Sequence, residues 1–115
     1  MDINSINITG NLTNEPEVIG RRDDSGAVSE PLGTKIRIAS NYRTKKGDEW
    51  VDAVNYINIV AWGGLGGIVE KNTRTGSKVA VTGEMRWREW EQEGSRREAI
   101  EVHASSVVFL SPKPA

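Results

Sequence analysis

Hydrophobic and polar residues alternate near the N-terminus of the chain. Ile6, Ile8 and Leu12 are separated by asparagine, threonine and glycine residues. Because side chains alternate between the two faces of a strand, this period of two predicts a half-buried strand rather than a helix. We expect this first strand to cover residues 3–12.

A second alternation runs through residues 34–40. Ile36 and Ile38 share one face of the predicted strand, while Lys35 and Arg37 share the other. Burial of the isoleucines therefore places two cations on the outer face of this strand.

Residues 20–33, between these two strands, have the composition of a loop. The segment is rich in glycine, serine and charged residues and contains Pro31, a composition typical of turns. We therefore expect a mobile segment that is too polar to pack against a core.

A long third strand is predicted over residues 50–62, after a hairpin tip at residues 44–48. Ile57, Ile59 and Ala61 share its more aliphatic face, which is the expected core side. The opposite face carries Val54, Tyr56, Asn58, Val60 and Trp62. Aromatic and polar side chains are therefore expected on the outside of this strand.

One short helix is predicted after this strand. Leu65, Ile68, Val69 and Asn72 have helical spacing, although nearby glycines weaken the helix. A fourth strand follows over residues 78–90. It places Val79, Val81 and Met85 on one face and Arg86, Arg88 and Trp90 on the other.

A fifth strand is expected over residues 98–110, after a turn around Gly94. Five strands with one helix between the third and the fourth predict an all-β OB-fold barrel. The length of 115 residues suits one domain. We expect that domain over residues 1–110, with a short C-terminal tail over residues 111–115.

The total charge gives no indication of nucleic-acid binding, but the distribution of charge does. The chain has 15 Lys and Arg against 16 Asp and Glu, a net charge of -1. Residues 35–46 nevertheless carry basic side chains and no acidic ones: Lys35, Arg37, Arg43, Lys45 and Lys46. Such a local basic stripe favours contact with phosphates.

Two predicted strands combine cations with aromatic side chains on their outer faces. Unpaired bases stack on exposed aromatic rings, and cations hold the phosphates, so this combination is typical of single-stranded nucleic-acid binding. Tryptophans more often serve packing than base stacking. We therefore assign Trp50 and Trp87 mainly to packing or loop contacts, and Phe109 to the core.

No catalytic or cofactor-binding group stands out. The chain has no cysteine and a single histidine, His103, so a zinc cluster or a Cys/His nucleophile is unavailable. We interpret His103 as a surface strand residue, Gly63–Gly67 as a strand-to-helix turn, and Glu89, Glu91 and Glu93 as part of a solvated hairpin. The expectation is a protein that is not an enzyme and has no cofactor and no metal.

Neither a secretory signal nor an apolar stretch long enough for a membrane span is visible. The residues after Met1 lack a basic region followed by an apolar run, and a membrane span needs about 20 apolar residues. We expect a soluble intracellular protein.

Several short motifs occur in an order and spacing that are fairly specific. They are Gly10-Asn11-Leu12, Pro16-Glu17-Val18, Ile59-Val60-Ala61-Trp62-Gly63, Gly76-Ser77-Lys78-Val79, and Arg86 to Trp90 after Gly83. With these motifs, almost the whole chain resembles the DNA-binding domain of bacterial single-stranded DNA-binding proteins.

The resemblance implies base stacking at Tyr56, Trp62 and Trp90, and a further family aromatic near the end of the second strand corresponds to Tyr42. The family commonly has tryptophan at the position of Tyr56 and phenylalanine at that of Trp62, so stacking ability is retained. Together with the basic stripe, the predicted DNA-binding residues are Lys35, Arg37, Tyr42, Arg43, Lys45, Lys46, Tyr56, Asn58, Trp62, Arg86, Arg88 and Trp90.

The resemblance also implies a homotetramer, assembled by way of dimers, that coats DNA in replication, recombination and repair in the bacterial cytoplasm. The predicted oligomer interface contains Ile3, Ile6, Ile8 and Ile57. Family members continue into a flexible region with an acidic tip that recruits other proteins, whereas this sequence stops at Ala115. A trimmed chain and a short paralogue, plasmid or phage form all fit, and recruitment of replication and repair proteins is left open.

Two alternatives stay open. One is an oligomeric primosome-type accessory protein with the same fold, in which DNA binding is secondary. The other is a small metal-dependent nuclease, which only the acidic hairpin at Glu89 to Glu93 favours.

Overall fold

The computed structural model describes residues 1–112 of the chain. Its elements, in chain order, are β1 (Ile6–Leu12), β2 (Glu17–Arg22), β3 (Val28–Lys46), β4 (Glu49–Trp62), α1 (Gly63–Asn72), β5 (Lys78–Gln92) and β6 (Ser95–Phe109). Of the predicted tail, residues 113–115 lie outside the described residues.

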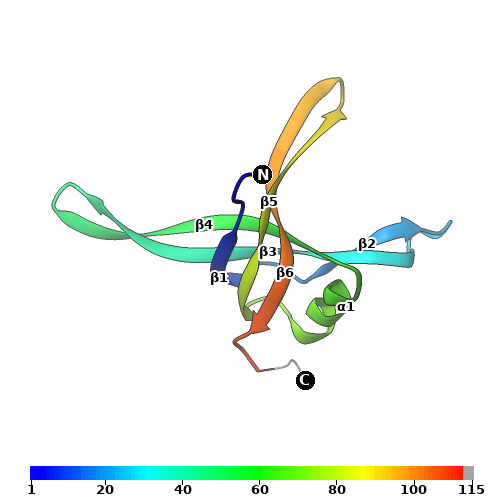
Figure 1. The fold of residues 1–115 in the computed structure, drawn as a ribbon, viewed down its shortest axis with the longest axis horizontal. Coiled ribbons are helices and arrows are strands. Elements are labelled where there is room, and N and C mark those ends of the chain that lie inside the picture. Colours follow the sequence, from blue (N-terminus) through cyan, green and yellow to red (C-terminus); the bar gives the residue numbers. More distant parts are fainter. Residues whose placement is uncertain (113–115) are drawn as a thin grey trace.

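Five strands close into a barrel. The sheet order is β1-β5-β6-β4-β3-β2, and an additional pairing of β1 with β3 closes the ring. The β4–β6 pairing is parallel, with Ile59 opposite Val102, and the other pairings are antiparallel. The predicted all-β barrel with one short helix is therefore confirmed, and Figure 1 shows α1 beside its lower end.

Apolar side chains from every barrel strand meet inside. Ile38 and Ile59 have no exposed surface, and Val69 of α1 is equally buried. At Gly10 the barrel closes so tightly that a Cβ atom would lie 2.7 Å from the carbonyl oxygen of Ala39. A glycine is therefore needed where β1 passes β3.

The first strand begins at Ile6, three residues later than predicted. The side chain of Asn4 donates from Nδ2 to the Met85 carbonyl and accepts from the Met85 amide at Oδ1, both at 2.8 Å. The Asn4 side chain thus occupies the Met85 amide and carbonyl, with which the backbone of a longer β1 would have paired. The β1–β5 pairing therefore ends before Asn4.

The prediction of an unstructured loop over residues 20–33 is wrong. The segment contains the end of β2, a turn and the start of β3, which pair as a hairpin. This extra strand places α1 between the fourth and fifth strands, whereas the sequence predicted it between the third and fourth.

Hydrogen bonds in the turn explain how such a polar segment becomes ordered. Oδ1 of Asp23 accepts bonds from the amides of Ser25 at 2.9 Å and Ala27 at 3.2 Å. Bonds from Ser25, first from its hydroxyl, lower the pKa of Asp23. Gly26 adopts φ +87°, and Arg21 pairs with Glu30 at 3.7 Å. Local polar contacts, not core packing, therefore stabilise this hairpin.

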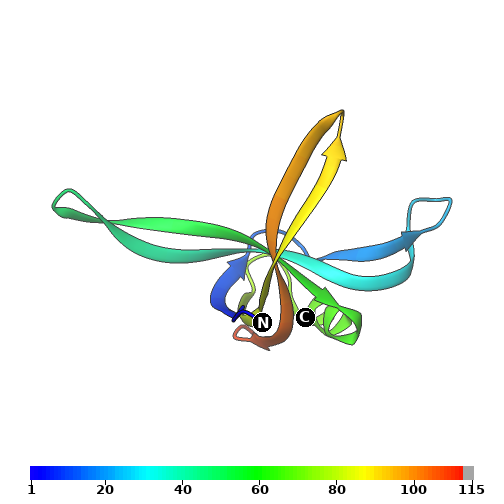
Figure 2. The same cartoon turned by 45° about the horizontal axis from the view of Figure 1, so that its top comes forward.

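Three hairpins project from the barrel as arms (Figures 1 and 2). They are β2–β3, β3–β4 and β5–β6, and they give the molecule extents of 57 × 43 × 33 Å. The predicted strands at 34–40 and 98–110 are longer in the structure because they extend into these arms.

Two residues differ from the predicted burial. Val60, on the predicted outer face, is only 3% exposed and lies opposite His103 of β6. Met85 was expected to be buried with Val79 and Val81 but is 44% exposed. The register shift between Thr82 and Gly83 marks the point near which β5 leaves the barrel for its arm.

Within residues 1–112, the single helix is too short and too polar to cross a membrane.

Candidate nucleic-acid interface

The side of β3, β4, β6 and β5 that points away from the barrel core forms one continuous surface, which we call the outer face. Strand register joins it: Arg37 lies opposite Asn58, Val60 opposite His103, and Glu101 opposite Arg86. Because side chains alternate along each strand, Lys35, Tyr56, Trp62, Arg88 and Trp90 share this face. The structure thus brings most of the predicted DNA-binding residues together.

Arg37 and Tyr56 form the first aromatic and cationic pair on the outer face. The Arg37 guanidinium carbon lies 4.2 Å from the centre of the Tyr56 ring. Tyr56 is still 55% exposed. The contact holds a positive charge beside a ring that keeps room for a base.

Arg88 and Trp90 repeat this arrangement on the β5–β6 arm. The Arg88 guanidinium carbon lies 4.6 Å from the centre of the Trp90 ring, and Arg97 lies opposite Trp90 on β6. A second stacking platform with adjacent cations therefore lies farther out along the same face.

Trp62, at the end of β4, is held by a histidine. Its Nε1 donates to Nδ1 of His103 at 3.2 Å, and the two rings meet edge to face with centroids 5.9 Å apart. On the other side of the imidazole, Nε2 lies 3.0 Å from Oε1 of Glu101. His103 is half-buried and part of the outer face, so our interpretation of it as an ordinary surface residue missed these contacts.

Two neighbouring grooves lie on this face and share Glu17 and Lys35, and together we call them the furrow. One groove of about 310 Å³ is lined by residues that include Lys35, Trp62 and Arg88. A neighbouring groove of about 210 Å³ includes Lys35, Arg37 and Asn58. Glu17 lines both, so the floor of the furrow is not uniformly positive.

Carboxylates partly compensate two of the predicted cations. Arg86 donates to Oε1 of Glu84, with its Nε at 3.0 Å. Arg43, on the β3–β4 arm, lies 3.4 Å from Asp52. Both arginines remain more than half exposed at the side chain. They can exchange an exposed carboxylate for a phosphate.

The β3–β4 arm divides the remaining predicted residues between its two sides. Lys45 lies opposite Trp50, on the same side of β3 as Arg37. Tyr42 and Lys46 lie on the other side, which Ile36 and Ile38 share. Trp50 is 60% exposed, so it is a further candidate for stacking that sequence reasoning assigned to packing or loop contacts. Trp50 and Tyr56 are an even number of residues apart in one strand, and this spacing could have placed Trp50 on the side of Tyr56 from the sequence alone.

Three of the predicted interface residues, Ile6, Ile8 and Ile57, lie on the side of the sheet opposite to the outer face. Ile6, Ile8 and Ile57 line a groove of about 370 Å³ together with Met85 and Ile100. Ile3 is 98% exposed near the N-terminus, and Trp87, which we assigned to packing, is 57% exposed. This side of the molecule therefore presents uncovered apolar surface.

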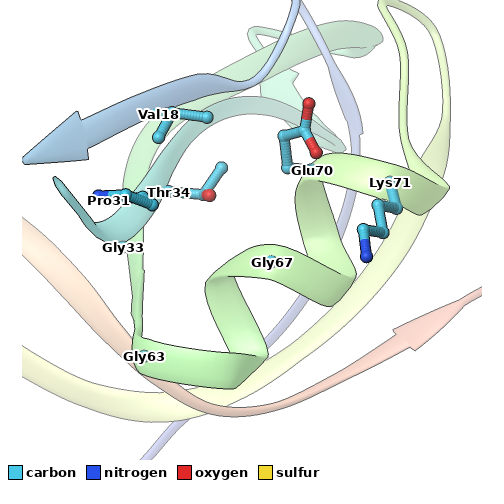
Figure 3. Close-up of a pocket in the computed structure, with 8 residues that line it drawn as sticks. All are labelled: Val18, Pro31, Gly33, Thr34, Gly63, Gly67, Glu70 and Lys71. Atoms are coloured by element: carbon cyan, nitrogen blue, oxygen red, sulfur yellow. The ribbon is translucent and has the colours of Figure 1, made fainter. Parts of the chain in front are cut away.

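A further pocket of about 340 Å³ lies between the β2–β3 hairpin and α1 (Figure 3). Its lining includes Val18, Pro31, Glu70 and Lys71. Gly63 adopts φ +64° where β4 turns into α1, so the change of direction lies at Gly63. The other residues of the predicted turn, 64–67, are already helical. The pocket is separate from the outer face.

In the part of the chain that the structure describes, no group of three or more His, Cys, Asp or Glu side chains could hold a metal ion. Glu93 and Gly94 instead form the tip of the β5–β6 arm, with φ of 52° and 75°. This hairpin agrees with the predicted turn around Gly94.

The model of the single-strand binding protein family matches residues 3–110, which is nearly the whole chain. The chain belongs to this family. Among curated relatives, the single-stranded DNA-binding protein of Treponema pallidum is 37% identical over 109 residues, which cover 95% of this chain and 58% of that protein. Single-stranded DNA-binding protein 2 of Chlorobaculum tepidum is 35% identical and covers 97% of this chain and 74% of its own length.

Solved structures of family members share the fold. A Plasmodium falciparum single-strand binding protein in complex with single-stranded DNA has a TM-score of 0.78 at 19% identity and covers 96% of this chain and 97% of its own. The small single-stranded DNA-binding protein of Streptomyces coelicolor has a TM-score of 0.69 at 23% identity, with 95% of each chain covered. The family fold thus extends over nearly all of the chain.

Proposed function

We propose that this chain binds single-stranded DNA with little sequence preference, without catalysis and without a cofactor. The observation that carries the proposal is the outer face, where Tyr56, Trp62 and Trp90 lie among arginines and a lysine. Exposed rings stack on any base, and each stack contributes about 1–3 kcal/mol. Family membership and the names of the relatives support the same function.

The path that we propose for the DNA follows the furrow. Bases stack on Tyr56, Trp62 and Trp90, while Lys35, Arg37 and Arg88 contact phosphates and Asn58 offers hydrogen bonds. Arg86, Arg43, Lys45 and Lys46 extend the positive surface, and Tyr42 is a secondary contact on the other side of the arm. Coating of DNA in replication, recombination and repair, in the bacterial cytoplasm, is the corresponding cellular role.

Titration of the intrinsic tryptophan fluorescence with oligothymidines of increasing length, at two salt concentrations, tests this proposal. Stacking predicts quenching, and phosphate contacts predict weaker binding at higher salt. Unquenched fluorescence at low salt would contradict the proposal. It would favour a primosome-type accessory role, in which protein contacts dominate.

Incubation of labelled single strands with the protein and magnesium tests the absence of catalysis. Intact DNA is the expected result. Cleavage that disappears on Glu91→Gln would revive the nuclease hypothesis.

We also propose that the chain assembles with itself, as a homotetramer, through the apolar groove beside Ile57. Residues 6–10 of β1 pair with β5 on one edge only, because the β1–β3 pairing contains just Asn11 and Leu12. An open strand edge next to Ile6, Ile8 and Ile57 favours pairing with another chain. Ile3 would add to this contact.

A further inference from the structure

The hydrogen bonds around His103 determine where its proton lies. The indole Nε1 of Trp62 can only donate a hydrogen bond. Nδ1 of His103, 3.2 Å away, must therefore accept and carries no proton. The neutral ring then carries its proton on Nε2, which donates to Oε1 of Glu101 at 3.0 Å.

The chain of contacts is anchored in the barrel. Glu101 is only 8% exposed, and its side chain and that of His103 are 10% and 24% exposed. Beside them, a Cβ atom at Gly83 would lie 2.2 Å from the His103 carbonyl oxygen, so β5 presses closely on β6 at this point. The imidazole therefore has a rigid base, whereas the indole that it holds is 48% exposed.

We propose that His103 and Glu101 are positioning residues, which hold the Trp62 indole in the orientation that stacks on a DNA base. The proposal rests on the proposed DNA binding. A fixed ring loses less conformational entropy when a base binds than a ring that must first be ordered. His103 acts through Trp62 and need not touch DNA.

The first test observes the indole N–H of Trp62 by NMR in the free protein. Its resonance is assigned by its disappearance in Trp62→Phe. At one fixed pH, we expect the signal to shift and to exchange faster with water in His103→Val, which removes the acceptor, than in the wild type. In His103→Gln, which keeps a donor and an acceptor, the signal should stay close to that of the wild type.

The second test is a double-mutant cycle on the affinity for oligothymidine at neutral pH. We expect His103→Val to weaken binding about two- to tenfold, the value of one hydrogen bond. In the Trp62→Phe background, which lacks the indole N–H, the same change should have almost no effect. His103→Gln should restore most of the affinity.

The outcomes separate the two proposals. An indole signal that is identical in wild type and His103→Val overturns the positioning. An equal loss in both backgrounds also overturns it, because His103 would then act independently of Trp62. A protein whose indole signal changes in His103→Val as expected, but whose wild type does not bind DNA, overturns the proposed function alone.

Discussion

Trp62 is the aromatic residue whose role can be tested most directly. Its ring is half exposed, and its N–H is engaged at one edge. We expect Trp62→Ala to weaken binding of single strands by about 1–3 kcal/mol, the range for a lost base stack. Fluorescence titration measures the affinity, and circular dichroism checks the fold.

Ile68→Ala is a matched control for Trp62→Ala. Ile68 is a half-exposed apolar residue of α1 and is not part of the outer face. It should bind DNA like the wild type. Normal binding by Trp62→Ala, or its unfolding, would contradict a stacking role for Trp62.

Arg88 and Arg86 differ in their partners, so their substitutions should differ in effect. Arg88 lies over Trp90, whereas Arg86 is paired with Glu84. We expect Arg88→Ala to reduce the log-log salt slope of binding by about 0.7, the value for one phosphate contact with a single strand. Arg86→Ala should reduce it less, since Glu84 already neutralises part of the Arg86 charge.

Affinities measured across a salt series give both slopes. An unchanged slope for Arg88→Ala would mean that this arginine serves an intramolecular or subunit contact. The Glu84→Gln variant is the control, because freeing Arg86 from its carboxylate should strengthen binding.

Contacts between the two strands of a hairpin can be predicted from the sequence, but contacts between strands that are distant in the sequence cannot. The alternation in residues 34–40 and 50–62 predicts that Arg37 and Tyr56 share a face, as found. The contact of Trp62 with His103 spans 41 residues and depends on a parallel β4–β6 pairing. Local periodicity contains no information on that pairing.

Among the elements, the β2–β3 hairpin shows where composition misleads. Glycine, serine and charge indicate a loop, and hydrophobic periodicity is too weak in residues 20–33 to predict a strand. The backbone groups of this segment pair with each other instead, and Asp23 organises the turn. A hairpin that backbone pairing and polar side chains stabilise has no apolar periodicity, so a search for apolar patterns does not find it.

We expect Asp23→Ala to loosen this turn while leaving the barrel intact. The hydrogen bonds that lower the pKa of Asp23 favour its charged form. Their contribution is therefore present above the pKa of the unfolded chain and is lost as the pH falls through the lower pKa of the folded chain. Amide hydrogen exchange at Ser25 and Ala27 should become faster.

Asp24→Ala removes the same charge one residue further along and serves as the control. Its amide exchange at Ser25 and Ala27 should stay near that of the wild type. A drop in global unfolding temperature for Asp23→Ala would show instead that the hairpin and the barrel unfold together.

The whole molecule is more extended than a compact domain of its length. Its radius of gyration is 16.1 Å, against about 13 Å for a compact domain of roughly 100 residues. The arms account for the difference, and their apolar sides have no cover within the described chain: Met85, Trp87 and Ile100 are 44%, 57% and 59% exposed. Such a surface is typical of a subunit interface.

A charge in the apolar groove should break the proposed assembly. Ile57→Lys is ambiguous alone, because Ile57 also packs against the barrel core. Ile100→Lys places the same charge in the same groove on a residue that is 59% exposed, so the barrel should tolerate it. We expect light scattering to report a smaller species and circular dichroism to report a folded one.

Leu32→Lys, on the exposed part of the β2–β3 hairpin, controls for the added charge and should assemble normally. A wild-type protein that is monomeric at micromolar concentration would contradict the assembly. Ile100→Lys with wild-type mass would show that the groove is not the interface.

The β5–β6 arm carries Arg88 and Trp90 on one side and Trp87 and Ile100 on the other. If the first side binds DNA and the second side contacts another subunit, both contacts are made by the same two-stranded arm. The coupling free energy between the two contacts is then reciprocal. If bound DNA strengthens subunit association by a given free energy, subunit association strengthens DNA binding by the same free energy. Dilution, which separates the subunits, would then lower the affinity for DNA. Saturating DNA would make the melting temperature less dependent on protein concentration.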